Sequence, residues 1–222
     1  MISHTHQCIF IHIPKAAGSS IEKKLGFFDE LADGVQDHRT IREIEPFPVS
    51  KWLHAPYWKS IKGRTKSIIR QRRHISAQNY RSYYKFTFVR NPWARAYSWY
   101  RNVIRDPQHQ QKLKVSPDCS FQDFLRHHLD NWALQSQLEW ITDTQGNIPL
   151  DFIGRFEHLH QDFAKVCQTL GIDDPNLPEL LKTHHGNGSK NHYTEAFDAE
   201  GKDIIATAFK DEIQYFNFEF GE

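Results

Sequence analysis

The sequence predicts an α/β protein with a central parallel sheet flanked by helices, and three observations lead to this prediction. Residues 7–13, 84–89 and 151–156 are short apolar runs rich in β-branched and aromatic side chains, which is typical of buried strands. A segment with helical features follows each run, so strands and helices alternate along the chain. The chain has 222 residues, a length that one hydrophobic core can serve. We therefore expect one domain over residues 1–222.

The first strand is joined to its helix by a tight loop. The run QCIFIHI stops at Pro14, and KAAGSS follows before a helix that starts near Ser20. Successive backbone N–H groups in such a turn form a nest for an anion, and Gly18 lets the backbone approach a phosphate closely. Lys15 adds a positive charge, and Ser19 and Ser20 add hydroxyl donors. The alternative is an ordinary turn with a solvated lysine. The G-x-x-x-x-G-K-[ST] loop of nucleoside triphosphatases is absent, because the lysine precedes the glycine.

The second strand is followed at once by a helix start. A polar stretch over residues 27–80, broken by prolines, separates it from the first unit and is expected to be an insertion. After the strand YKFTFV, Asn91 is suited to the N-cap and Pro92 to the first helical position. The helix is expected to continue to about Arg105.

Arg90 and Ser98 form the second candidate motif. The strand delivers Arg90 to the carboxyl edge of the sheet, where open α/β sheets bind ligands. Ser98 lies two helical turns further along. An arginine and a hydroxyl that converge there suit a terminal phosphate, because arginine makes bidentate contacts. The alternative is that Arg90 caps a neighbouring helix and Ser98 faces solvent.

The rest of the chain continues the pattern. Ser120 is placed to cap a helix over residues 121–129. Apolar residues at helical spacing within residues 157–170, closed by Gly171, predict a helix after the third strand. Residues 201–218 predict a final amphipathic helix that is followed by an aromatic tail.

Charge is distributed unevenly along the chain. Residues 46–105 contain fourteen lysines and arginines and no aspartate or glutamate, although the formal net charge of the chain is only +1. A positive field of this kind attracts an anionic ligand. A nucleotide, an acidic saccharide and a nucleic acid are all candidates, and a solvated basic face is the alternative.

Several other classes of protein are not indicated. Cys8, Cys119 and Cys167 are odd in number and widely spaced, which argues against a disulfide framework or a zinc ribbon. The adjacent histidine pairs at 127–128 and 184–185 lack metal-ligand spacing, so we expect no metal site. No apolar run is long enough to span a bilayer, and the first residues are too polar for a signal peptide. We expect a soluble, cytoplasmic protein.

Together the two motifs resemble those of a known family. The segment IFIHIPKAAGSSIE resembles the 5′-phosphosulfate loop of the sulfotransferases that use 3′-phosphoadenosine 5′-phosphosulfate (PAPS). FTFVRNPWARAYSWY is similar to their 3′-phosphate site, in which a serine follows an arginine eight positions later. FVRNP and IGRFEHL resemble the carbohydrate branch that includes the heparan 2-O-sulfotransferases and their bacterial relatives, and the end of the chain resembles how such chains end. The resemblance is weak over residues 47–82, which we treat as a basic insertion.

The resemblance implies a P-loop-like sulfotransferase fold with PAPS lying across the carboxyl edge of the sheet. It implies that Lys15 and the following loop hold the 5′-phosphosulfate, that Arg90 and Ser98 hold the 3′-phosphate, and that residues 189–191 close over the nucleotide. In full, the implied nucleotide-binding residues are Lys15, Ala16, Ala17, Gly18, Ser19, Ser20, Arg90, Ser98, Ser189, Lys190 and Asn191.

Sulfonyl transfer also needs catalytic groups. Like phosphoryl transfer, it is an in-line displacement, and Lys15 is placed to stabilise charge on the leaving oxygen without a metal. A general base must take the proton of the acceptor hydroxyl, and histidine suits this role near neutral pH. His38, His54 and His74 are candidates for this base, and Glu22 is a weaker candidate. DHRTIRE around His38 resembles the position of the catalytic histidine in the 2-O-sulfotransferases, and His74 could also fit the bacterial relatives.

The acceptor is expected to be a hydroxyl, on a saccharide by resemblance only. Trp52, Tyr57 and Trp58 lie among the basic residues and could stack on sugar rings or belong to the core. The alternatives are a nucleotide or small-molecule kinase and a non-catalytic protein that binds nucleotide or acidic glycan with the same fold. Nucleic-acid binding is a third alternative, and we expect no nucleic-acid partner. The sequence leaves the oligomeric state open.

Overall fold

A four-stranded sheet forms the centre of the computed structural model, which describes residues 1–26, 36–46, 74–178 and 192–222. The strands are β1 (Ile2–Ser3), β2 (Cys8–Ile11), β3 (Tyr84–Val89) and β4 (Phe152–Arg155), and they lie side by side in this order. Strands β2, β3 and β4 are parallel, and β1 is an antiparallel strand at the edge. The parallel sheet predicted from the sequence is confirmed, with β1 as an addition.

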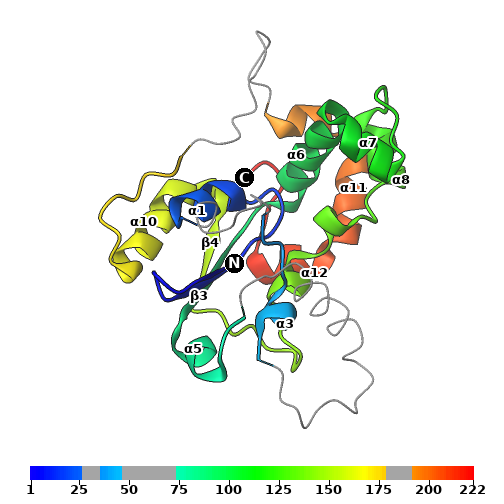
Figure 1. The fold of residues 1–222 in the computed structure, drawn as a ribbon. Helices are drawn as coiled ribbons and strands as arrows, with labels where there is room; N and C mark the ends of the chain where they lie inside the picture. The colour runs from blue at the N-terminus through cyan, green and yellow to red at the C-terminus, as the bar shows by residue number, and fades with distance from the viewer. Residues whose placement is uncertain (27–35, 47–73, 179–191) are drawn as a thin grey trace, which may run out of the picture.

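Helices surround this sheet. They are α1 (Gly18–Lys24), α3 (Ile41–Ile44), α5 (Ala77–Ser82), α6 (Pro92–Arg105), α7 (Pro107–Leu113), α8 (Phe121–His127), α9 (Gln137–Ile141), α10 (Leu159–Leu170), α11 (Ala199–Ala208) and α12 (Lys210–Phe216), with 3₁₀ turns η3 (Trp132–Leu134), η4 (Phe156–His158) and η5 (Tyr193–Ala196). Figure 1 shows α1 and α10 together on one side of the strands, with α6, α7, α8 and α11 gathered on the other. None of the helices in the described ranges is long and apolar enough to cross a membrane.

Aromatic side chains join the strands to the helices. Phe10 of β2 stacks on Phe86 of β3 with ring centroids 5.1 Å apart. Phe88 lies two residues further along β3 and packs against Phe163 of α10 at 6.4 Å. A Cβ on Gly154 of β4 would lie only 2.4 Å from the Phe88 ring, so β4 needs glycine at this point. This close packing fixes the parallel strands, and with them the loops that follow their carboxyl ends.

Capping residues set where α6 begins. The side chain of Asn91 accepts hydrogen bonds from the backbone N–H groups of Trp93 and Ala94, and Pro92 occupies the first turn. The predicted cap, helix start and helix end at Arg105 are all confirmed. The predicted single C-terminal helix is wrong, because the chain breaks at Phe209 into α11 and α12.

The two ends of β3 lie at opposite edges of the sheet. Helix α5 precedes β3 at its amino end, and α6 follows it at its carboxyl end (Figure 1). Because β2 is parallel to β3, the loop after β2 also emerges at the carboxyl edge. Both candidate motifs therefore share one edge.

Candidate functional site

The loop between β2 and α1 has an unusual backbone. Lys15 and Ala17 both have left-handed φ angles, 68° and 67°, with Ala16 between them. Such angles cost of order 1 kcal/mol for residues with a Cβ and cluster at functional sites. Left-handed residues in a short loop turn successive N–H groups toward the same side, which forms a concave site for an anion.

Gly18 allows His12 to pack directly beneath this loop. A Cβ at Gly18 would lie 1.9 Å from Cδ2 of the His12 ring, so no larger residue fits without displacing the ring. His12 is buried, and its Nδ1 lies 3.0 Å from Oε1 of the fully buried Glu22 in an ion-pair contact without hydrogen-bond geometry. Glu22 therefore lies under the loop and away from solvent. This position does not suit a general base, the role for which the sequence made Glu22 a weaker candidate.

Lys15 has no carboxylate partner among the residues that the structure describes. Its Nζ lies 3.4 Å from the side-chain oxygen of Asn102 on α6. Burial, together with the positive charges of Arg90 and Arg105, lowers the pKa of Lys15 from 10.5 to about 8. A half-buried cation with cationic neighbours favours the binding of an anion.

Arg90 links the two candidate motifs. Its Nη1 donates a hydrogen bond of 3.0 Å to the backbone carbonyl of Lys15. The guanidinium lies over the ring of Phe156 with 4.0 Å between its central carbon and the ring centroid. Burial lowers the pKa of Arg90 to about 10, an effect that Glu157 partly opposes. The Nε donor is buried and has no hydrogen-bond partner within the described ranges, so Arg90 can still bind an acceptor such as a phosphate.

Ser98 lies on the same helix face as a residue that contacts the loop. Ser98 and Asn102 are one helical turn apart on α6, and Asn102 reaches Lys15. Ser98 is partly exposed, and its hydroxyl makes no hydrogen bond with the part of the chain described here. The structure thus brings Lys15, Arg90 and Ser98 to one edge.

His38 also lies beside the loop. Its Nδ1 is 3.2 Å from the carbonyl oxygen of His12, and the two rings are 4.1 Å apart between centroids. Its Nε2 is 2.9 Å from Oε1 of Gln36, and Nε2 of Gln36 donates to the Ser19 hydroxyl at 2.5 Å. The carbonyl of His12 and Oε1 of Gln36 both only accept, so Nδ1 and Nε2 each donate in this arrangement, and Nε2 must release its own proton before it can take one from an acceptor. Nε2 is the nitrogen that a general base needs.

His74 is not part of this cluster. It is exposed and precedes α5, at the amino end of β3. Strand β3 has six residues, which span roughly 20 Å, so His74 and Arg90 belong to opposite edges of the sheet. The remaining predictions, namely Trp52, His54, Tyr57, Trp58, Ser189, Lys190 and Asn191, lie outside the described residues.

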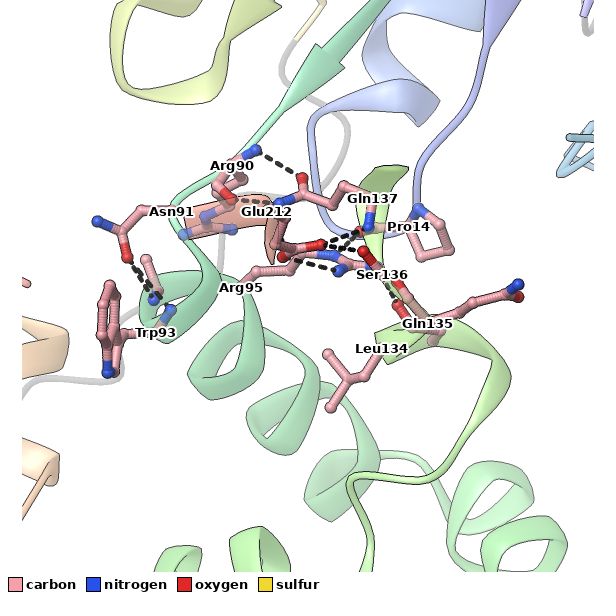
Figure 2. Close-up of polar contacts among 12 residues, drawn as sticks. Pro14, Arg90, Asn91, Trp93, Arg95, Leu134, Gln135, Ser136, Gln137 and Glu212 are labelled. Carbon is pink, nitrogen blue, oxygen red and sulfur yellow. Dashed lines mark hydrogen bonds and ion pairs between the residues drawn. The ribbon is translucent and has the colours of Figure 1, made fainter. Parts of the chain in front are cut away.

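A buried polar network behind the motifs was missed from the sequence. The side-chain amide of Gln137 pairs with both backbone groups of Arg90, accepting from its N–H and donating to its carbonyl, each at 2.8 Å (Figure 2). Glu212 is fully buried and accepts from the Gln137 N–H at 2.5 Å and from the Ser136 hydroxyl at 2.9 Å. This network fixes the backbone at Arg90.

Arg95 extends the network to the first motif. Its Nε donates to the carbonyl of Pro14 at 3.2 Å, and its Nη1 lies 4.0 Å from Glu212 (Figure 2). Burial lowers the pKa of Arg95 to about 10, which Glu212 partly opposes. One signal was available: Arg95, Trp99 and Val103 lie at helical spacing on one buried stripe of α6, where a charge needs an internal partner.

The fold and the site define an α/β protein with a cationic site at the carboxyl edge of its parallel strands. The model of one protein family, described as "Sulfotransferase family", matches residues 1–219, and the chain therefore belongs to the sulfotransferase family. The family supports an enzyme that transfers a sulfonyl group. A protein of Archaeoglobus fulgidus, described as uncharacterized, is 28% identical over 125 residues, which are 55% of this chain and 92% of the relative. No solved structure matches the chain.

Proposed function

We propose that the protein transfers a sulfonyl group from PAPS to the hydroxyl of an acceptor, with His38 as the general base. One observation supports this most directly: Arg90 Nη1 donates to the Lys15 carbonyl at 3.0 Å, so the two motifs adjoin. A molecule with a phosphosulfate at one end and a 3′-phosphate at the other can therefore contact both.

The residues present fit the two ends of this donor. The left-handed loop and the cation of Lys15 suit the 5′-phosphosulfate. The unpartnered buried donor of Arg90 and the hydroxyl of Ser98 suit the 3′-phosphate. Residues 189–191, which lie outside the described ranges, remain part of the proposal as a segment over the nucleotide. Within those ranges no group of three or more potential metal ligands occurs.

Two residues divide the work of transfer. As the S–O bond to the 5′-phosphate breaks and a new S–O bond to the acceptor forms, Lys15 stabilises the charge that develops on the leaving oxygen. His38 accepts the acceptor proton on Nε2 and holds the resulting positive charge near Glu22, the carboxylate that pairs with its neighbour His12. His38 is anchored through Nδ1 to the His12 carbonyl, which keeps Nε2 oriented.

A saccharide is the proposed acceptor. The resemblance to the heparan 2-O-sulfotransferase branch and its bacterial relatives supports it, as does the acid-free basic stretch over residues 46–105.

Transfer from radiolabelled PAPS to a panel of saccharides, phenols and aliphatic alcohols tests the proposal. His38→Ala is expected to lower kcat by about 10²–10⁴-fold, because no general base remains to take the proton of the acceptor hydroxyl. His74→Ala is the matched control, since its histidine is exposed at the other edge of the sheet, and it is expected to keep full activity.

Three other outcomes contradict the proposal in different ways. An active His38→Ala together with an inactive His74→Ala reverses the assignment of the base. Magnesium-dependent phosphoryl transfer would instead indicate a kinase. Wild-type protein that binds 3′,5′-bisphosphoadenosine (PAP) but transfers to no hydroxyl supports a non-catalytic binding protein.

A further inference from the structure

Trp132 is an exposed indole beside the proposed base. It begins η3 and is 39% exposed, and Tyr215 is the other large exposed hydrophobic residue in the described ranges. Its ring centroid lies 5.2 Å from that of His38 in an edge arrangement and 5.9 Å from that of Trp99. A large apolar ring left open next to a reactive group is typical of a ligand-binding surface.

Arg95 holds this indole in a fixed position relative to the donor loop. Its Nη2 donates to the carbonyls of Ala133 at 2.6 Å and Gln135 at 3.0 Å, and its Nε donates to the Pro14 carbonyl. Figure 2 shows the Arg95 side chain between Pro14 and the segment that follows η3. One buried guanidinium therefore joins the backbone that carries Trp132 to the backbone that carries Lys15, so an acceptor on the indole keeps a constant distance from the sulfonyl group.

A lysine lies beside the indole. Nζ of Lys112 lies 5.9 Å from the centroid of the Trp132 ring, and Lys112 itself is exposed. Residues 84–114 contain seven lysines and arginines and one acid, Asp106, whose carboxylate is paired with His109 at 2.5 Å. The ligand that fits this surface has an apolar face for the ring and an anionic group for the lysine.

We propose that Trp132 and Lys112 form the acceptor platform, on which a pyranose ring of an acidic saccharide stacks with a hydroxyl turned toward His38. This inference rests on the proposed function and adds the residues that select the acceptor. The C–H face of a pyranose covers the indole, and a carboxylate or sulfate on the same or the adjoining sugar pairs with Lys112.

Steady-state transfer to a size-defined glucuronic acid–N-acetylglucosamine oligosaccharide tests the platform. Trp132→Ala is expected to raise the KM for this acceptor by about tenfold or more, because the whole stacking surface is removed. Trp132→Phe should raise it by less, because a smaller aromatic ring remains. Lys112→Gln should raise the KM for the acidic oligosaccharide and leave that for an uncharged maltooligosaccharide unchanged. Tyr215→Ala removes a more exposed ring elsewhere and is expected to change neither value.

Two further measurements separate this inference from the proposed function. The Kd for PAP should stay within about twofold in Trp132→Ala, which also shows that the variant is folded. If PAP binding weakens as much as acceptor binding does, the indole stacks on adenine and the platform is wrong. If the KM is unchanged, or if wild type sulfates phenols but no saccharide, the platform is likewise wrong. If wild type transfers to nothing, the proposed function fails, and direct titration of the oligosaccharide into wild type and Trp132→Ala still decides the platform.

Discussion

At the scale of single residues, the site is set up by cationic side chains that keep unused hydrogen-bond donors among the described residues. Lys15 is half-buried between cationic neighbours, and within the described ranges its Nζ contacts only the neutral amide of Asn102. Arg90 keeps a buried N–H without a partner in the described part of the chain. Leaving such groups unsatisfied costs stability, and an anionic ligand removes that cost.

The lowered pKa of Lys15 predicts how PAP affinity depends on pH. Below pH 8 Lys15 is already charged and PAP binds directly, whereas above it binding must also protonate the amine. The Kd for PAP should therefore rise by up to about tenfold per pH unit above 8, as measured by isothermal titration calorimetry. Lys15→Arg should abolish this rise, because arginine stays charged throughout. A wild-type Kd that is constant from pH 7 to 9.5 would show that Lys15 does not contact the ligand.

At the scale of elements, the sequence predicted best where local signals were strong. Strand β3 has the predicted bounds, and α6 has the predicted cap and end, because apolar runs, Asn91 and Pro92 act locally. Strand β1 has two residues, which is too short for an alternation of apolar and polar side chains to be detected. The turn η3 is held by hydrogen bonds from Arg95, which is distant in sequence. Lys15, Arg90 and Ser98 were predicted from their positions after two strands and from the resemblance, and His38 was chosen by resemblance. The contacts between them, and the network through Gln137 and Glu212, come from segments far apart in sequence.

The Arg95 network predicts a coupled loss of stability. Arg95→Met should lower the free energy of unfolding by about 3–5 kcal/mol, because Glu212 is left as a buried charge without its cation. Adding Glu212→Gln should cost less than it does alone, so a double-mutant cycle in urea should show coupling. The matched control is Arg126→Met, which breaks the exposed pair with Glu200 and should cost about 1 kcal/mol or less. A loss in Arg95→Met no larger than in the control would contradict the network.

At the scale of the whole molecule, the topology places both motifs after neighbouring parallel strands. Strands β2 and β3 are adjacent although residues 12–83 separate them, so the Lys15 loop and Arg90 emerge side by side at one edge. The acid-free region of the sequence also includes Arg90 and α6, which adds a positive field at this edge. Together these features favour one ligand that carries an anionic group at each end.

Calorimetric titration of wild type and Arg90→Gln with PAP and with 5′-AMP measures whether a single nucleotide contacts both motifs. Wild type should bind PAP at least about 30-fold more tightly than 5′-AMP, a difference of about 2 kcal/mol for the 3′-phosphate. Arg90→Gln should reduce this preference and leave the affinity for 5′-AMP unchanged, because the Lys15 loop is intact. Equal wild-type affinities for the two nucleotides, or an equal loss of both in Arg90→Gln, would contradict a shared site.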